Sequence, residues 1–195
     1  MKMLICFMQL LFVSIACVAQ EVNYKNLIAE ATQGDARSQS LLGYIYYFGG
    51  LNVSQDYSKA VYWFQKCEDQ GKAEASAQTL LGECYYHGKG VKQDLKMAYE
   101  LFVKASKNGN TYGKALLGEM FYKGDYVSKD YNKAFELFHV AATDKNTPNA
   151  HAMRMLSACY RYGLGTTIDT EKGKYWLEEA AKHKDDKAMM VAGMK

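Results

Sequence analysis

The chain has 195 residues, of which 49% are hydrophobic, and Pro148 is its only proline. This composition favours a folded, helical protein and argues against a disordered one. The formal net charge of +3 is small and the lysines are spread along the chain, so charge excludes a strongly basic nucleic-acid-binding protein.

Residues 1–19 have the features of a secretory signal peptide. Lys2 precedes a mainly apolar run, and small residues at Cys17 and Ala19 precede a polar junction. The run is shorter than the ~20 residues that a spanning helix needs. We expect cleavage before Gln20, a secreted or periplasmic protein, and no transmembrane segment in the mature chain. Lipid anchoring at Cys17 is the alternative, but Ser14 is a poor residue three positions before a lipidated cysteine.

After this leader one pattern recurs four times. Each copy has a small residue and, further on, an aspartate, and both markers repeat every 36 to 39 residues. Two independent markers with one period indicate a repeat array. We place the repeats at about 34–70, 71–108, 109–147 and 148–183. The small residues are Gly43, Gly82, Gly118 and Ser157, and the aspartates are Asp56, Asp94, Asp130 and Asp169.

Each copy predicts two helices. With the small residue as position zero, positions −2, −1, +2 and +3 are mostly large and apolar, which predicts the buried face of a first helix. A glycine at position zero indicates close backbone approach, because it costs about 1 kcal/mol within a helix. A loop glycine then ends the first helix, and the aspartate is the N-cap of the second. The loop glycines are Gly49, Gly88, Gly124 and Gly163.

The second helices show one apolar stripe, and the array has incomplete ends. Trp63 and Trp176 share a position in this stripe, so we interpret them as core residues rather than as a ligand cage. Residues 20–33 resemble the tail of a second helix, and residues 184–195 resemble the start of a new repeat. We expect both segments to cap the array by covering apolar faces that lack a neighbouring repeat.

Three cysteines follow the leader: Cys67, Cys84 and Cys159. Cys84 and Cys159 share a position two repeats apart, and stacked helices are separated by roughly 10 Å per unit. That separation exceeds the ~7 Å limit between the Cα atoms of a disulfide. Cys67 stands where other copies have alanine. We therefore interpret all three as small buried hydrophobic residues and expect no disulfide.

The combined pattern, small-x-x-x-Leu-Gly-x-x-Tyr-x-x-Gly and then Val-x-x-Asp-x-x-x-Ala-x-x-Trp-Phe, resembles the Sel1-like repeat family, a variant of the tetratricopeptide repeat, over residues 24–195. The resemblance implies an all-α fold, a right-handed superhelical solenoid of about four tetratricopeptide-like helix pairs with half-repeat caps. It also implies a scaffold or adaptor in a protein complex. Departures at Ser157, Thr166, Gly173 and around residues 50–52 leave this fold expectation unchanged.

The same resemblance supplies an alternative function. Some cysteine-rich secreted members are described as penicillin-binding or β-lactamase-like, which implies a cell-wall-active hydrolase. An acylating serine of that kind needs Ser-x-x-Lys, and no serine in this chain has a lysine three residues later. The histidines (His87, His139, His151, His183) occupy different repeat positions, so we expect no metal site. We expect no catalytic residue, no cofactor and no enzymatic activity.

Positions −3, +1 and +4 of the first helices predict an exposed stripe opposite the buried one. In tetratricopeptide-like solenoids the first helices line the concave face. Tyrosine suits recognition because it offers a large contact area with a polar tip; the alternative is that these tyrosines only pack against the next repeat. We predict a monomeric, exported scaffold that binds a protein or peptide partner, and no nucleic acid, through Tyr44, Tyr47, Glu83, Tyr86, Glu119, Tyr122 and Arg161.

Overall fold

The computed structural model describes residues 23–50 and 52–184, and within these ranges the regular secondary structure is α-helical, apart from one isolated bridge between Gly50 and Val53. The predicted signal peptide, and the C-terminal half-repeat beyond residue 184, lie outside the described residues. None of the helices in the described ranges is both long and apolar enough to cross a bilayer. The chain divides into two compact units, Met1–Ala73 and Glu74–Lys195.

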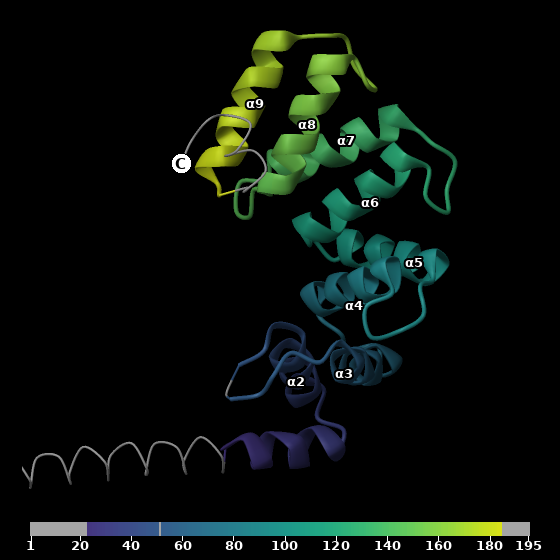
Figure 1. Ribbon diagram of the computed structural model, residues 1–195, viewed down its shortest axis with the longest axis vertical. Coiled ribbons are helices and arrows are strands. Elements are labelled where there is room, and N and C mark those ends of the chain that lie inside the picture. Colours follow the sequence, from purple (N-terminus) through teal and green to yellow (C-terminus); the bar gives the residue numbers. More distant parts are fainter. Residues whose placement is uncertain (1–22, 51, 185–195) are drawn as a thin grey trace, which may run out of the picture. The chain divides into compact units, whose positions relative to one another are not determined.

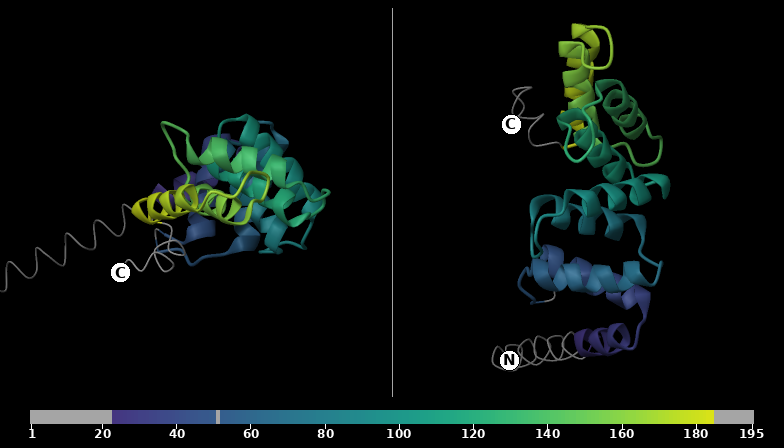
Figure 2. Two further views of the ribbon diagram at one scale, coloured as in Figure 1. Left: turned by 90° about the horizontal axis from the view of Figure 1, so that it is seen from above. Right: turned by 90° about the vertical axis from the view of Figure 1, so that its right-hand side faces the viewer.

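The helices follow the repeats, which confirms the all-α helical-repeat fold. Unit 1 holds a helix over 23–32, then α2 (Ala36–Phe48) and α3 (Tyr57–Asp69). Unit 2 holds α4 (Ala75–His87), α5 (Leu95–Lys107), α6 (Thr111–Lys123), α7 (Tyr131–Ala142), α8 (Ala150–Tyr162) and α9 (Thr170–Lys182). Figure 1 shows the antiparallel pairs of unit 2 in chain order, and Figure 2 shows the same pairs from two further directions.

The four aspartates are N-caps, as the sequence predicts. In the second repeat the Asp94 carboxylate accepts a hydrogen bond from the Met97 N–H at 3.0 Å, and Asp56, Asp130 and Asp169 make the same contact three residues on. The Asp94 N–H also donates to the carbonyl oxygen of Tyr85 at 3.0 Å, a bond with counterparts in the other repeats. Each aspartate therefore starts the second helix and ties it to the first.

The glycines at position zero allow the two helices of a repeat to meet at an aromatic ring. A Cβ atom placed on Gly82 would lie 2.6 Å from the Cε1 atom of Phe102, which is 1% exposed. Gly43 faces Phe64 and Gly118 faces Phe138 in the same way. The close approach predicted from the sequence is therefore present in three repeats, and its partner is a buried phenylalanine.

One residue of the predicted buried face is exposed. Leu41, at position −2 of α2, is 47% exposed, whereas its counterparts Leu80, Leu116 and Met155 are buried. Leu116 and Met155 lie on first helices that pack against the first helix before them. Within the described residues only a single helix precedes α2, and it corresponds to a second helix. Position −2 of α2 therefore lacks the preceding first helix against which the helices of Leu116 and Met155 pack.

Candidate partner-binding surface

The first helices of unit 2 carry a cluster of polar and aromatic side chains. α4, α6 and α8 pack directly on one another across the repeats, in addition to packing on their own second helices. We name the residues that bridge them the first-helix cluster: Glu83 and Tyr86 of α4, Tyr112, Glu119 and Lys123 of α6, Asp125 of the following loop, and His151 and Arg154 of α8. Three of the predicted site residues, Glu83, Tyr86 and Glu119, are brought together in this cluster.

Glu119 connects two repeats. Its Oε1 atom lies 2.6 Å from the Lys123 ammonium one helical turn away, and its Oε2 atom lies 3.2 Å from His151 Nε2 on α8. Burial alone would raise the pKa of the Glu119 carboxyl, but the hydrogen bonds from His151 and Lys123 hold that pKa at about 2. The carboxylate is therefore ionised at neutral pH and holds α6 against α8.

The neighbouring contacts fix the tautomer of His151. Its Nδ1 atom lies 2.8 Å from a terminal nitrogen of the Arg154 guanidinium. A guanidinium only donates hydrogen bonds, so Nδ1 accepts, and the neutral ring carries its hydrogen on Nε2. That hydrogen is donated to Glu119 Oε2. The imidazole is thus oriented from both sides, by a cation and by a carboxylate.

Tyrosine hydroxyls connect α4 to the third repeat. The Tyr86 hydroxyl donates to Asp125 Oδ2 and accepts from Lys123 Nζ at 3.0 Å. The Tyr112 hydroxyl donates to Glu83 Oε1 at 2.9 Å. Burial, together with these carboxylates, raises the pKa of both phenols, so both stay protonated and can donate. The cluster therefore joins three successive first helices through oriented polar groups.

The two predicted site residues of unit 1, Tyr44 and Tyr47, pack against aromatic rings of their own repeat. Tyr47 is 7% exposed, and its ring lies 5.3 Å from that of Tyr57. The Tyr44 ring meets Phe64 edge-on at 5.3 Å and is half-buried. The expectation that position +4 is exposed is therefore wrong for Tyr47. The physical reason is that its ring is also packed against the ring of Phe48, 4.9 Å away between centroids, in addition to Tyr57 and Phe64.

Tyr122 and Arg161 also belong to unit 2 but are not members of the first-helix cluster. The half-buried Tyr122 ring lies 5.4 Å from Tyr131 and 6.3 Å from Phe138. Arg161 is exposed, and its guanidinium carbon lies 5.6 Å from the centroid of the Tyr162 ring. Of the predicted site residues, Arg161 thus offers the most open charged group.

In the first three repeats position −3 is buried rather than exposed, contrary to the predicted stripe, and only in the fourth does it carry a half-buried residue, Arg154. Ser40, Thr79 and Ala115 are all buried, at 5%, 1% and 0% exposure. The Thr79 hydroxyl donates to Ala75 O at 2.8 Å and to Asn110 Oδ1 at 3.1 Å, and the Ser40 hydroxyl lies 3.2 Å from Cys67 Sγ. These residues are covered because the end of the second helix closes over them.

The sequence analysis missed Tyr112, Lys123, Asp125 and His151. Tyr112 and His151 share position −6, seven residues before the +1 position of Glu119, and seven residues are two helical turns. Extending the stripe by two turns would have found both. Lys123 lies four residues after Glu119, the spacing of a helical ion pair. Asp125 lies in a loop, where helical spacing gives no signal.

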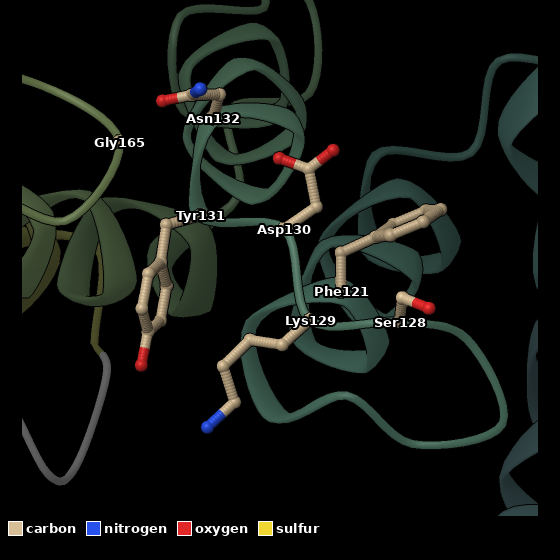
Figure 3. A pocket seen from close by; sticks show the side chains of 7 residues that line it. All are labelled: Phe121, Ser128, Lys129, Asp130, Tyr131, Asn132 and Gly165. Atoms are coloured by element: carbon tan, nitrogen blue, oxygen red, sulfur yellow. The ribbon is translucent and has the colours of Figure 1, made fainter.

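Unit 2 also has a shallow hollow, but the polar side chains that line it do not point towards a common centre. It lies where the loop before α7 meets Gly165, and its lining includes Phe121, Lys129, Asp130 and Asn132. Figure 3 shows that the side chains of Lys129 and Tyr131 point to one side and those of Asp130 and Asn132 to the other. Asp130 is also engaged in capping α7. A small-molecule site needs polar groups aimed at one point, so this hollow is not a candidate site.

The described part of the chain contains no group of three histidine, cysteine or carboxylate side chains that could hold a metal ion. Its cysteines, Cys67, Cys84 and Cys159, are free and buried. Burial raises the pKa of the Cys84 thiol to about 12 and that of the Cys159 thiol to about 11. These thiols are core residues, as the sequence predicts.

The sequence matches one protein-family model in four successive segments. The Sel1 repeat model matches four segments, residues 36–72, 75–110, 112–146 and 150–185. Two Arabidopsis thaliana proteins are similar over part of the chain, the ERAD-associated E3 ubiquitin-protein ligase components HRD3A and HRD3B. HRD3A is 35% identical over 36% of this chain, and HRD3B is 32% identical over 48% of it. The matched regions span only 10% and 14% of those two proteins.

Two solved structures share the fold over 88% of the chain. A Sel1 repeat protein from Oxalobacter formigenes superposes with a TM-score of 0.79 at 28% identity, and 66% of that chain is covered. A protective antigen present in uropathogenic Escherichia coli strains, described as displaying an SLR fold, gives 0.71 at 27% identity, with 37% of that chain covered.

Proposed function

Because the chain belongs to the Sel1 repeat family, whose repeats commonly mediate protein–protein interaction, we propose that it is an exported scaffold without enzymatic activity. It holds a protein or peptide partner on the concave face of its solenoid, which the first helices form. The contact residues of this proposal are those predicted within unit 2, Glu83, Tyr86, Glu119, Tyr122 and Arg161, and the protein acts as a monomer.

The first-helix cluster is the observation that carries the proposal. A surface whose polar groups are held by neighbouring repeats keeps one geometry before the partner arrives, and preorganisation lowers the entropy that binding costs. Glu119 and His151 are held in this way, and the half-buried tyrosines add area with few rotatable bonds. Direct packing of α4, α6 and α8 also supports an inner position for these helices.

The packing of the tyrosine rings decides how the proposal is tested. Replacing Tyr86 or Tyr122 with alanine would remove a ring that packs on a core phenylalanine, 6.3 Å away between centroids in both cases. Loss of binding could then reflect loss of the fold. Phenylalanine keeps the ring and deletes only the hydroxyl, so the informative variants are Tyr86→Phe, Tyr122→Phe and Arg161→Lys.

The experiment is photo-crosslinking in the native cell, with a photoreactive amino acid at position 161 on α8 or, as a control, at the exposed position 136 on α7. We expect a defined crosslinked product from position 161 and none from position 136. The product should weaken when Tyr86→Phe is combined with Tyr122→Phe. Equal crosslinking from both positions, or a product that the tyrosine variants leave unchanged, would refute the assignment to the first helices.

A β-lactamase-like hydrolase is the alternative function. It is disfavoured by the lack of any Ser-x-x-Lys in the sequence. A nitrocefin assay on the purified chain separates the two functions. We expect no turnover above that of a matched heat-denatured sample, and turnover that survives repeated purification would support the hydrolase.

A further inference from the structure

Unit 1 contains a cavity of ≈ 370 Å³ that the proposed function does not use. It lies on the side of α3, next to the helix over 23–32, and not among the first-helix residues proposed to bind a partner. Its lining includes Gln39, Tyr62, Trp63, Lys66, Asp69 and Gln70. A cavity of this size has the dimensions of a small-ligand site, and its mainly polar lining with two aromatic rings suits a polar ligand.

Two aromatic rings form one wall. The Tyr62 and Trp63 rings meet edge-on, with centroids 4.9 Å apart and planes at 77°. Trp63 packs against the core formed by Ala31, Leu42 and Ile45, which fixes its position. Tyr62 is 53% exposed and so has little core function. The wall therefore combines a fixed indole with an accessible phenol ring.

A pair of amides orients the polar side. Gln39 is 3% exposed, and its Nε2 atom donates to the Ala31 carbonyl at 2.9 Å. Its Oε1 atom accepts from Gln70 Nε2 at 2.8 Å. Gln70 Nε2 also donates to the Lys66 carbonyl oxygen at 3.4 Å, so its hydrogens are directed to the protein, and the Oε1 atom is the part of the Gln70 amide left for a ligand. The buried Gln39 amide therefore holds the Gln70 amide in position, and Gln70 is the one of the two that a ligand can contact.

The charges of the cavity favour a neutral ligand. The Lys66 ammonium already lies 5.8 Å from the centroid of the Tyr62 ring, where a cationic ligand would otherwise bind. The Asp69 carboxylate, which accepts from Gln65 at 2.8 Å, stands one turn away and opposes an anion. One cation and one carboxylate together provide donors and an acceptor without a net charge.

Comparison among the repeats shows that only the first one combines these elements. The second repeat has the equivalent amide pair, with Asn108 Nδ2 donating to Gln78 at 3.1 Å, but Glu100 and Leu101 stand where Tyr62 and Trp63 do. The fourth repeat has the equivalent aromatic pair, Tyr175 and Trp176, 5.2 Å apart. There Met153 and His183 take the positions of Gln39 and Gln70. Core packing alone therefore does not require the combination.

We propose that this cavity binds a sugar ring of a neutral saccharide. The apolar C–H face of a pyranose packs on the face of the Trp63 ring, whose π-electrons carry partial negative charge, and its edge meets Tyr62, because the two ring planes stand at 77°. Its neighbouring hydroxyls exchange hydrogen bonds with the Gln70 amide, the Asp69 carboxylate and the Lys66 ammonium. Cell-wall glycans and protein-linked glycans both present such rings, so the experiment needs an arm for each.

The test is a fluorescence titration of the full chain. The chain has two tryptophans, so a Trp176→Phe background makes Trp63 the reporter. The neutral probes are fully N-acetylated chitotriose, which presents β-linked N-acetylglucosamine, and mannotriose, which presents mannose. Choline chloride and inorganic phosphate are the charged probes. We expect saturable binding of one saccharide in the millimolar range or tighter, weakened about tenfold or more by Tyr62→Ala and by Gln70→Ala, as for a central contact.

Tyr175→Ala is the matched control, because Tyr175 has the same 53% exposure as Tyr62 and keeps an aromatic neighbour, phenylalanine at position 176, in this background. It should leave binding unchanged. Circular dichroism melting of each variant separates lost binding from lost folding, and exposed Gln70 keeps the test valid if Tyr62→Ala is unstable. No saturable response to either saccharide overturns the proposal. Binding of choline or phosphate instead overturns the neutral ligand, and equal sensitivity to Tyr175→Ala overturns the location.

Discussion

The hydroxyl of Ser157 donates a hydrogen bond to the carbonyl oxygen of Gly173 at 2.6 Å, joining the two helices of the fourth repeat. The other repeats have glycine and alanine at these positions, and a phenylalanine covers the glycine. In the fourth repeat Leu177 takes the place of that phenylalanine. The smaller Leu177 on α9 thus accompanies the larger Ser157 on α8, whereas Gly173 leaves room for Arg161, whose Cγ atom would lie 2.5 Å from a Cβ atom at that position.

The pairing of Ser157 with Leu177 predicts how the second repeat responds when its glycine is enlarged and its phenylalanine is reduced. Gly82→Ala places a methyl group 2.6 Å from a ring carbon of Phe102, and overpacking of this kind costs about 1–3 kcal/mol. Phe102→Leu alone should also destabilise by loss of burial. The double variant should lose less than the sum, because the smaller leucine makes room for the methyl group. Urea unfolding of the four proteins measures the coupling, and strictly additive losses would contradict the proposed fit.

Substitutions of the tyrosines at position +4 should differ in how much they lower the free energy of unfolding. Tyr47→Ala removes a ring that is 7% exposed and should cost about 3–5 kcal/mol, as for other buried aromatic residues. Tyr122→Phe keeps the ring against Phe138 and should change the free energy of unfolding by about 0.5 kcal/mol or less. Thermal and urea unfolding test both values. A Tyr47→Ala protein as stable as the wild type would argue against the packing described for unit 1.

Acid should weaken the contact between α6 and α8. The pKa of Glu119 is about 2 in the folded chain against an ordinary 4.5, so its stabilisation is fully present above 4.5 and is lost as the pH falls from there towards 2. After allowance for solvent screening the loss amounts to about 2 kcal/mol. Glu119→Gln should be less stable at neutral pH and should lack this part of the acid dependence. Urea unfolding across that pH range measures both, and parallel pH profiles would remove Glu119 from its assigned role.

The cysteines should be unreactive in the native chain. Cys84 and Cys159 are buried with raised thiol pKa values, and Cys67 is fully buried. Iodoacetamide at neutral pH should therefore leave these three thiols unmodified until the chain is unfolded. Mass spectrometry with and without guanidinium compares the two states. Dithiothreitol should leave the melting temperature unchanged, and a decrease of many degrees would reveal a disulfide.

The sequence by itself determined the helices, the N-caps of the second helices and most of the core of each repeat. Asp94 predicted the start of α5 and Gly82 predicted the close approach of two helices, because such signals act within one helix or one turn. Because the pattern recurs every 36 to 39 residues, each local signal occurs in four copies. Agreement among four copies made the fold assignment independent of any single residue.

Only the tertiary structure decided which side chains meet across repeats. Glu119 and His151 are 32 residues apart, and Glu83 and Tyr112 are 29 apart, distances that follow neither a helical period nor the repeat period. Whether such residues touch depends on how far each helix pair is rotated against the next. The burial of Ser40 and Thr79 depended likewise on where the second helix ends. The packing angle between helices arises from all of their side chains together, so no local pattern in the sequence contains it.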